Sequence, residues 1–265
     1  MSLARQQLTT LISLFSLAMR FHSIFGLALL LATTTGAASA TAPQERILPQ
    51  SSSLANITQA QFDDFEELAR IVDIAYCVGT MNTGIDTPFE CLSYCKDFPS
   101  FELVQTWNTG MTLSDSCGFV ALSQPPARPR IVVAFRGTYS IVNALADLSL
   151  ARQEYMPYPS DGHTIEREKR CDGCTVHAGF LGSWSQTEKI VAPVVAELVR
   201  AYPQHELTLV GHSLGGAVAA LAALDFKARG WDPVVTTFGE PKAGNRELAN
   251  YFNRVHSSPP PSLPR

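Results

Sequence analysis

The stretch that decides the fold is Leu207-Thr208-Leu209-Val210-Gly211-His212-Ser213-Leu214-Gly215-Gly216, in which an apolar strand runs directly into a Gly-x-Ser-x-Gly turn. An Ala-rich helix is expected to follow over residues 216–229 and to end at Gly230. A sharp turn between a strand and a helix lifts its serine above the sheet, and the flanking glycines leave room where a Cβ would collide. The stretch therefore predicts a nucleophile elbow centred on Ser213.

The five-residue pattern alone is a modest signal, because average glycine and serine frequencies produce it by chance in about one chain in ten of this length. The alternative is a Gly-rich junction that binds phosphate. Such a loop ends in Lys-Ser or Lys-Thr, and neither pair follows Gly211 to Gly216. The apolar strand before the turn and the helix after it are the context that favours a nucleophilic serine.

Further strands and helices are expected on both sides of the elbow. Apolar runs predict strands over residues 101–107, 118–122, 130–136 and 234–238, of which 130–136 is apolar enough to be central. Helical spacing predicts one helix from Thr58 to Tyr76 and another over 183–201. Thr58 and Gln61 have the spacing of a capping box. Strands that alternate with helices indicate an α/β fold, with a mostly parallel central sheet covered by helices on both faces.

The composition and the N-terminal residues indicate a secreted globular protein. The 265 residues are 46% hydrophobic and 17% charged, and the net charge of −4 includes no basic segment that would suggest nucleic-acid binding. Residues 1–40 contain no acidic residue, and Arg20 precedes an apolar run and the small residues Ala38-Ser39-Ala40. This order is typical of a cleaved signal peptide, with residues before Met19 as an upstream extension. The apolar run is too short for a transmembrane anchor.

Residues 41–57 are polar and are expected to form a flexible lead-in or propeptide before a domain that spans 58–255. Asn56 lies in the one clean glycosylation sequon, Asn56-Ile57-Thr58. An even number of cysteines in a secreted chain indicates disulfides rather than a metal site. The expected short-loop pairs are Cys91 with Cys95 and Cys171 with Cys174, which leaves Cys77 and Cys117 as a third pair to consider. No zinc spacing accompanies them.

Four blocks of sequence, in order, resemble the fungal class 3 lipase family, which includes feruloyl esterases and belongs to the α/β-hydrolase superfamily. The blocks are Phe135-Arg136-Gly137-Thr138, Cys171-Asp172-Gly173-Cys174-Thr175-Val176-His177-Ala178-Gly179-Phe180, Gly211-His212-Ser213-Leu214-Gly215-Gly216 and Thr237-Phe238-Gly239-Glu240-Pro241-Lys242-Ala243-Gly244-Asn245. The resemblance covers roughly residues 60–255 and implies the α/β-hydrolase fold. In some relatives the cysteine that matches Cys77 pairs near the C-terminus.

The resemblance assigns roles to three residues of the predicted site. Ser213 would attack an ester carbonyl, as the pattern of the elbow also predicts. The backbone N–H of Leu214, together with the N–H and hydroxyl of Thr138, would form an oxyanion hole. Without the resemblance, Thr138 reads as an ordinary residue at the end of a strand. No metal or organic cofactor is implied.

The segment 139–150 would match the short amphipathic lid of lipases in this family. Its apolar face would consist of Ile141, Val142, Leu145 and Leu148. A plain surface helix is the alternative. Ala144 stands where several known lids carry a tryptophan, which weakens an expectation of strong activation at a lipid–water interface.

The resemblance also implies a catalytic acid and a histidine after Ser213, and the sequence has neither where the family has them. Asp225 lies in the helix after the elbow, and Asp232 precedes the next strand. His256 aligns with a non-catalytic histidine, and the Ser- and Pro-rich residues 256–265 follow without an aspartate. The domain is therefore expected to lack its C-terminal part, through an error in the gene model or a truncated product.

The other histidines are not candidates for the base. His212 is expected to point away from Ser213 because neighbouring side chains diverge. His177 lies in a block that is structural in the family, and His163 and His205 lie in polar surroundings typical of a surface.

Two functions are consistent with these features. The first is a secreted carboxylic ester hydrolase that forms an acyl-enzyme on Ser213, with acylglycerols as the preferred substrate class and feruloyl or other esters as the next. The second is a non-catalytic truncated homologue that binds lipid or no ligand. Neither involves nucleic acid.

Overall fold

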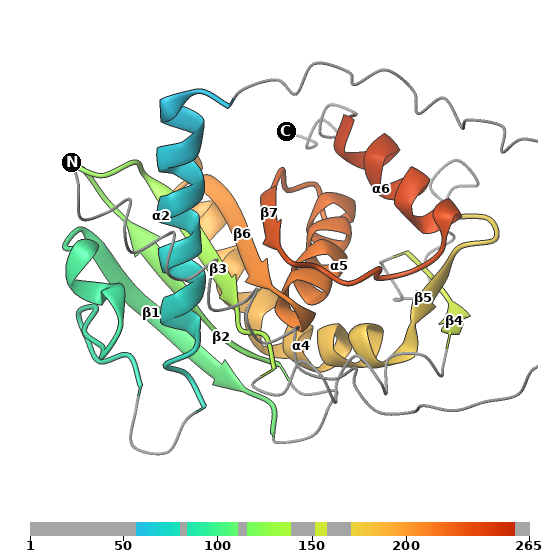
Figure 1. Cartoon of the computed structure of the whole chain (residues 1–265), viewed down its shortest axis with the longest axis horizontal. Helices are drawn as coiled ribbons and strands as arrows, with labels where there is room; N and C mark the ends of the chain where they lie inside the picture. The colour runs from blue at the N-terminus through green and yellow to red at the C-terminus, as the bar shows by residue number, and fades with distance from the viewer. Residues whose placement is uncertain (1–56, 80–83, 111–115, 139–151, 158–170, 258–265) are drawn as a thin grey trace, which may run out of the picture. The chain divides into compact units, whose positions relative to one another are not determined.

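The computed structural model describes residues 57–79, 84–110, 116–138, 152–157 and 171–257 (Figure 1). They belong to one compact unit, Ala55–Arg265, and the other unit, Met1–Leu54, lies outside the described residues. The predicted signal peptide, the predicted glycosylation site Asn56, His163 and the predicted lid residues also lie outside them. Among the helices of the described residues, none has the length and apolar character needed to cross a membrane.

The main sheet has five strands in the order β1-β2-β3-β6-β7 (Figure 1). Its strands are β1 (Phe101–Asn108), β2 (Cys117–Ser123), β3 (Arg130–Phe135), β6 (Glu206–His212) and β7 (Val234–Phe238). The apolar run of β3 correctly predicted a central strand. Two short strands, β4 (Arg152–Glu154) and β5 (Thr175–His177), pair separately in an antiparallel ribbon.

The expectation of a mostly parallel sheet needs correction, because the sheet is mixed. β3 pairs with β6, and β6 with β7, in parallel, but β1 pairs with β2, and β2 with β3, in antiparallel register. The physical reason lies in the connections. Only eight residues separate β1 from β2 and six separate β2 from β3, whereas a parallel pair needs a crossover of a dozen or more residues. Alternation of strands and helices begins only after β3.

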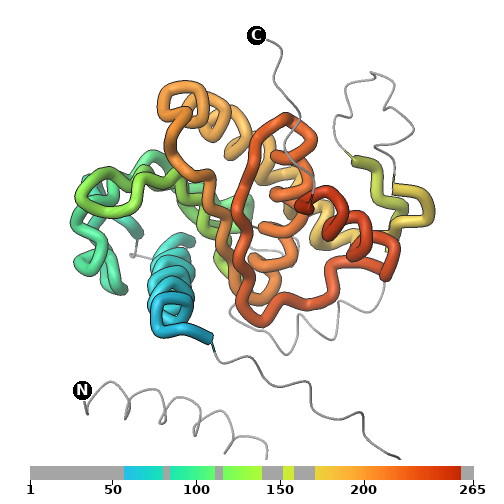
Figure 2. Tube along the Cα trace, turned by 90° about the horizontal axis from the view of Figure 1, so that it is seen from above, coloured from blue at the N-terminus to red at the C-terminus, as the bar shows by residue number. Residues whose placement is uncertain are grey.

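Helices cover both faces of the sheet, as predicted. The helix α2 (Gln59–Ala75) lies on one face, and α4 (Ala178–Ala201) and α5 (Leu214–Ala228) pack on the other (Figure 2). Side chains alternate along the strands, so that Val132 and Ala134 face α2 while Val133 and Phe135 face α4 and α5. The described residues also form the helix α6 (Arg246–Ser257) and the short 3₁₀ helix η1 (Tyr94–Asp97).

The helix boundaries follow from local capping. Thr58 accepts a hydrogen bond from the backbone of Gln61, and the Gln61 side chain accepts one from the backbone of Thr58, so the predicted capping box is confirmed. The helix α4 begins five residues before its predicted start because the His177 side chain caps it at Gly179. The helix α6 continues to Ser257, two residues past the predicted end of the domain.

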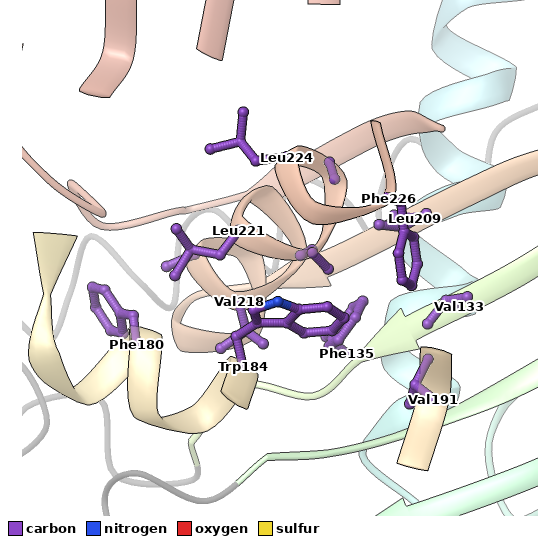
Figure 3. Packing of buried hydrophobic residues seen from close by; sticks show 14 of the residues in the cluster. Val133, Phe135, Phe180, Trp184, Val191, Leu209, Val218, Leu221, Leu224 and Phe226 are labelled. Atoms are coloured by element: carbon purple, nitrogen blue, oxygen red, sulfur yellow. The ribbon is translucent and has the colours of Figure 1, made fainter. Parts of the chain in front are cut away.

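The larger part of the core lies between the sheet and the α4–α5 pair (Figure 3). Trp184 of α4 packs edge-on against Phe135 of β3 and Phe226 of α5. Its buried indole N–H donates to Asp225 Oδ2 over 2.9 Å, so the polar atom is satisfied inside the apolar layer. This packing fixes α5, and with it the turn at the start of α5, against the sheet.

Two of the expected disulfides form, between Cys91 and Cys95 and between Cys171 and Cys174. The third pairing, of Cys77 with Cys117, is wrong, because no disulfide joins these two buried residues. The Cys117 thiol donates to Asn108 Oδ1 over 3.1 Å. The Cys77 thiol instead lies beside backbone groups in the loop that Cys91 and Cys95 close, and its burial raises its pKa.

Candidate functional site

The turn between β6 and α5 holds Ser213 in a strained backbone conformation. Its φ of 53° and ψ of −126° make it the single non-glycine residue with positive φ in the described part of the chain. Such a conformation costs of order 1–3 kcal/mol and persists only where the surrounding structure enforces it. Hydrogen bonds enforce it here: the Ser213 N–H donates to the Phe238 carbonyl, and the Gly216 N–H donates to the Ser213 carbonyl, each over 2.9 Å.

The glycines of the turn are required by close backbone contacts. A Cβ on Gly211 would lie 2.3 Å from the Gly215 carbonyl oxygen, and a Cβ on Gly215 would lie 2.5 Å from the carbonyl oxygens of Phe135 and Arg136. No side chain fits at such distances, because backbone atoms cannot move aside as a flexible side chain can. The start of α5 is therefore pressed against the end of β3.

The end of β3 brings Thr138 to the serine. A Cβ on Gly137 would lie 3.2 Å from the Ser213 Cβ and 2.6 Å from the His212 carbonyl oxygen, so Gly137 touches the turn and Thr138 follows directly. The Thr138 Oγ1 is buried and has no hydrogen-bond partner within the described ranges. A buried hydroxyl without a partner is costly.

The N-terminus of α5 lies directly after Ser213. Leu214 is the first residue of this helix and is buried, and Ser213 occupies the cap position without a side-chain cap. The first N–H groups of a helix have no partner within the helix, and the helix dipole favours negative charge there. Ser213, the N-terminus of α5 and Gly137, the residue before Thr138, therefore lie together at this turn.

The His212 side chain contacts residues outside the turn. Its Nδ1 lies 2.7 Å from the hydroxyl of Tyr76, the C-cap residue that directly follows α2. Its Nε2 lies against Gly239, where an added Cβ would be 3.6 Å away. Burial lowers the pKa of His212, so the neutral ring is favoured near pH 7. Sequence reasoning gave Tyr76 no functional role, because its helical spacing predicted only a place on the buried face of a helix.

Three acidic side chains that follow Ser213 in the chain, Asp225, Asp232 and Glu240, bond to other residues of the fold. Asp225 accepts hydrogen bonds from Trp184 and Arg229, and burial raises its pKa against the opposing effect of Arg229. Asp232 pairs with Lys227. Glu240 accepts a hydrogen bond of 2.7 Å from the Thr237 hydroxyl, and burial raises its pKa.

The remaining histidines of the described residues have structural surroundings. His177 caps α4, His205 lies 3.3 Å from Gln124 Oε1, and His256 stacks on Phe252 in α6. Burial lowers the pKa of His256. Among the described residues, no group of three or more His, Cys, Asp or Glu side chains is arranged to hold a metal ion.

Comparison with known proteins agrees with this geometry. A family model described as lipase (class 3) matches residues 132–258, which include the turn and Thr138. The chain is 50% identical over 219 residues to lipase A of Sodiomyces alcalophilus, covering 75% of this chain and 52% of that protein. The crystal structure of the lipase from Rhizopus microsporus var. chinensis is 30% identical with a TM-score of 0.63, and the match covers 85% of this chain and 74% of that one.

The chain belongs to the class 3 lipase family. The structural likeness also confirms the predicted α/β-hydrolase fold. A further relative in the family is the secreted mono- and diacylglycerol lipase 2 of Gibberella zeae, which is 47% identical over 254 residues, or 88% of this chain and 62% of that protein. The chain therefore spans between half and two thirds of the length of these two class 3 lipases.

Proposed function

We propose that the protein is a secreted class 3 lipase that hydrolyses acylglycerol esters through an acyl-enzyme on Ser213. The observation that carries this proposal is the strained Ser213 at the N-terminus of α5, with Gly137 against the turn. The hydroxyl of Thr138, the residue after Gly137, has no hydrogen-bond partner among the described residues, which supports its proposed role. The names of the relatives supply the substrate class and the secretion, since one of them is a secreted mono- and diacylglycerol lipase.

In the acylation step, Ser213 Oγ bonds to the carbonyl carbon of the ester while the bond to the glycerol oxygen breaks. The Oγ proton ends on that leaving oxygen. Water then attacks the acyl-enzyme, releases the carboxylic acid and restores the serine hydroxyl. The Leu214 N–H and the Thr138 N–H and hydroxyl would stabilise the oxyanion of both tetrahedral intermediates, and removal of one such donor costs about 3–4 kcal/mol of barrier.

Proton removal from Ser213 needs a general base, so the first test addresses the nucleophile directly. A p-nitrophenyl alkylphosphonate forms a covalent phosphonyl ester with an activated serine and releases p-nitrophenolate. We expect stoichiometric release and a mass increase on the peptide that contains Ser213. Ser213→Ala should abolish both, whereas Ser185→Ala, an exposed serine of α4, should leave them unchanged.

The second measurement is hydrolysis of mono-, di- and triacylglycerol emulsions by the same preparations, with a feruloyl ester as a further substrate. Preference for acylglycerols over the feruloyl ester supports the proposed substrate class. Absence of phosphonate labelling in the folded protein would overturn the proposal and favour a non-catalytic, lipid-binding homologue.

A further inference from the structure

The nucleophile turn is connected to α2 by a contact that neither the nucleophile nor the oxyanion donors require. Tyr76 lies immediately after α2, and its hydroxyl is 2.7 Å from His212 Nδ1. The two residues are 136 positions apart in the chain. The rings meet at a tilt of 53°, with centroids 6.1 Å apart, so the contact is made by the hydroxyl rather than by stacking.

The same hydroxyl reaches the end of β3. A Cβ on Gly137 would lie 2.5 Å from the Tyr76 hydroxyl, 2.6 Å from the His212 carbonyl oxygen and 3.2 Å from the Ser213 Cβ. Three elements therefore meet at Gly137: the end of α2, the nucleophile turn and the strand end that carries Thr138.

A second link fastens the segment after α2 to the same strand end. Arg136 Nη1 donates to the Val78 carbonyl over 2.6 Å, and its Nε donates to the Gly137 carbonyl over 3.2 Å. The residues on either side of Cys77, Tyr76 and Val78, thus contact the nucleophile turn at His212 and the end of β3 at Arg136 and Gly137. Burial favours the neutral form of His212, in which one ring nitrogen can accept a hydrogen bond from the Tyr76 hydroxyl.

We infer that Tyr76 is a positioning residue, whose hydroxyl fixes His212 and Gly137 so that the Thr138 and Leu214 donors lie at the correct distance from Ser213. This inference rests on the proposed function of Ser213. Tyr76 does not itself touch the reacting atoms in this role. It acts through the two residues that precede Ser213 and Thr138 in the chain.

The test compares Tyr76→Phe with the wild-type protein in the phosphonate reaction at varied probe concentration. Loss of a positioning hydrogen bond should lower the maximal rate of phosphonylation about fivefold, which is the rate equivalent of the roughly 1 kcal/mol that such a bond contributes, and leave the half-saturating probe concentration unchanged. Tyr202→Phe is the matched control, since Tyr202 packs on His205 near the start of β6, at the opposite end of the strand from Ser213. Its rate should equal that of the wild type.

Two variants of His212 distinguish the effect of its hydrogen bond with Tyr76 from the effect of its side-chain packing. His212→Asn keeps an acceptor near the place of Nδ1 and should retain most of the rate, whereas His212→Leu should lose as much as Tyr76→Phe. The double variant Tyr76→Phe/His212→Leu should be no slower than either single variant, because both remove one interaction. Additive losses, or a full rate in Tyr76→Phe, would overturn the inference. If Tyr76→Phe does not fold, the comparison of the two His212 variants decides.

Hydrogen exchange provides a readout that does not need a reactive serine. Amide exchange in the peptide containing Gly137 and Thr138 should be faster in Tyr76→Phe than in the wild type and unchanged in Tyr202→Phe. A wild-type protein without phosphonate labelling would refute the proposed nucleophile, and the exchange result would still decide whether Tyr76 fixes the strand end. Equal exchange in Tyr76→Phe and the wild type would overturn the inference.

Discussion

The two sides of the nucleophile turn differ in how firmly the fold holds them. On one side, β6 is buried along its central five residues and α5 is buried from Leu214 to Lys227. On the other side, no residue of β7 is fully buried, and α6 buries only Leu248 and Tyr251. A cavity of about 630 Å³, lined by both α5 and α6, lies where the two sides meet. We call the side formed by β6 and α5 the first side and the side formed by β7 and α6 the second side. Ser213 belongs to the first side but donates its N–H to the Phe238 carbonyl on the second.

This difference indicates that the conformation of Ser213 is imposed by β6 and α5 and only completed by the β7 side. Close-packed elements tolerate almost no change in volume, whereas a half-exposed strand can shift without a large loss of contact. The comparison makes four predictions, each of which contrasts a change on the first side with a matched change elsewhere.

Gly211→Ala should have the largest effect. The new Cβ would lie 2.3 Å from the Gly215 carbonyl oxygen and 2.5 Å from the Gly215 carbonyl carbon, and both atoms belong to the backbone. We expect a loss of more than about 4 kcal/mol in the free energy of unfolding, measured by urea denaturation. Gly182→Ala in α4 is the control, because no atom lies within 4 Å of its added Cβ, and it should stabilise the helix by about 0.5–1 kcal/mol. A folded Gly211→Ala protein of normal stability would break the comparison.

Asp225→Ala should have the next largest effect. It leaves the buried Trp184 N–H without its acceptor and Arg229 without its buried partner, and breaking a buried charge pair costs about 3 kcal/mol or more. Glu247→Ala, on the exposed side of α6, should change the free energy of unfolding by less than about 0.5 kcal/mol. Equal losses in the two variants would show that α6 is held as firmly as α5.

The sequence was informative about the first side because its signals are local. An apolar run, two glycines around a serine and an Ala-rich segment are adjacent in the chain, and together they predicted β6, the turn and α5. The run Val234 to Phe238 likewise gave the bounds of β7. The error lay in the sheet, because the direction of β1 and β2 depends on the lengths of their connections and not on their apolar character.

The predicted site was incomplete for a related reason. Ser213, Leu214 and Thr138 could be predicted because they lie in short motifs. Tyr76 carries no motif, and its contact with His212 spans 136 positions. The Cys77–Cys117 pairing failed similarly, since elimination among cysteines says nothing about which thiols point toward each other. Interactions between distant segments require the folded arrangement.

Lower pH should destabilise both sides through buried histidines, by a smaller amount than the two substitutions above. Burial lowers the folded-state pKa of His212 beside the turn and of His256 in α6. The unfolded chain protonates near pH 6.5, before these folded-state groups do. The free energy of unfolding should therefore be fully present above about pH 6.5 and fall as the pH drops toward the lowered values.

His212→Asn and His256→Asn each remove one of these groups and sharpen the comparison. Each variant should lose less free energy of unfolding between pH 7.5 and pH 5 than the wild type does, as measured by denaturation at a series of pH values. Ser185→Ala, an exposed residue of α4 that does not titrate, serves as the control and should follow the wild-type curve. A His212→Asn curve parallel to that of the wild type would mean that the ring beside Ser213 protonates as freely as in the unfolded chain.

Val234→Thr should have the smallest effect of all. This valine of β7 is 48% exposed, so the added hydroxyl remains in water and the free energy of unfolding should change by less than about 0.5 kcal/mol. The same substitution at Val210 in β6, which is fully buried, should cost about 1–3 kcal/mol because the hydroxyl is removed from water. If Val234→Thr cost as much as Val210→Thr, the outer side of β7 would be covered in solution, and the support of Ser213 through Phe238 would be as rigid as the support from α5.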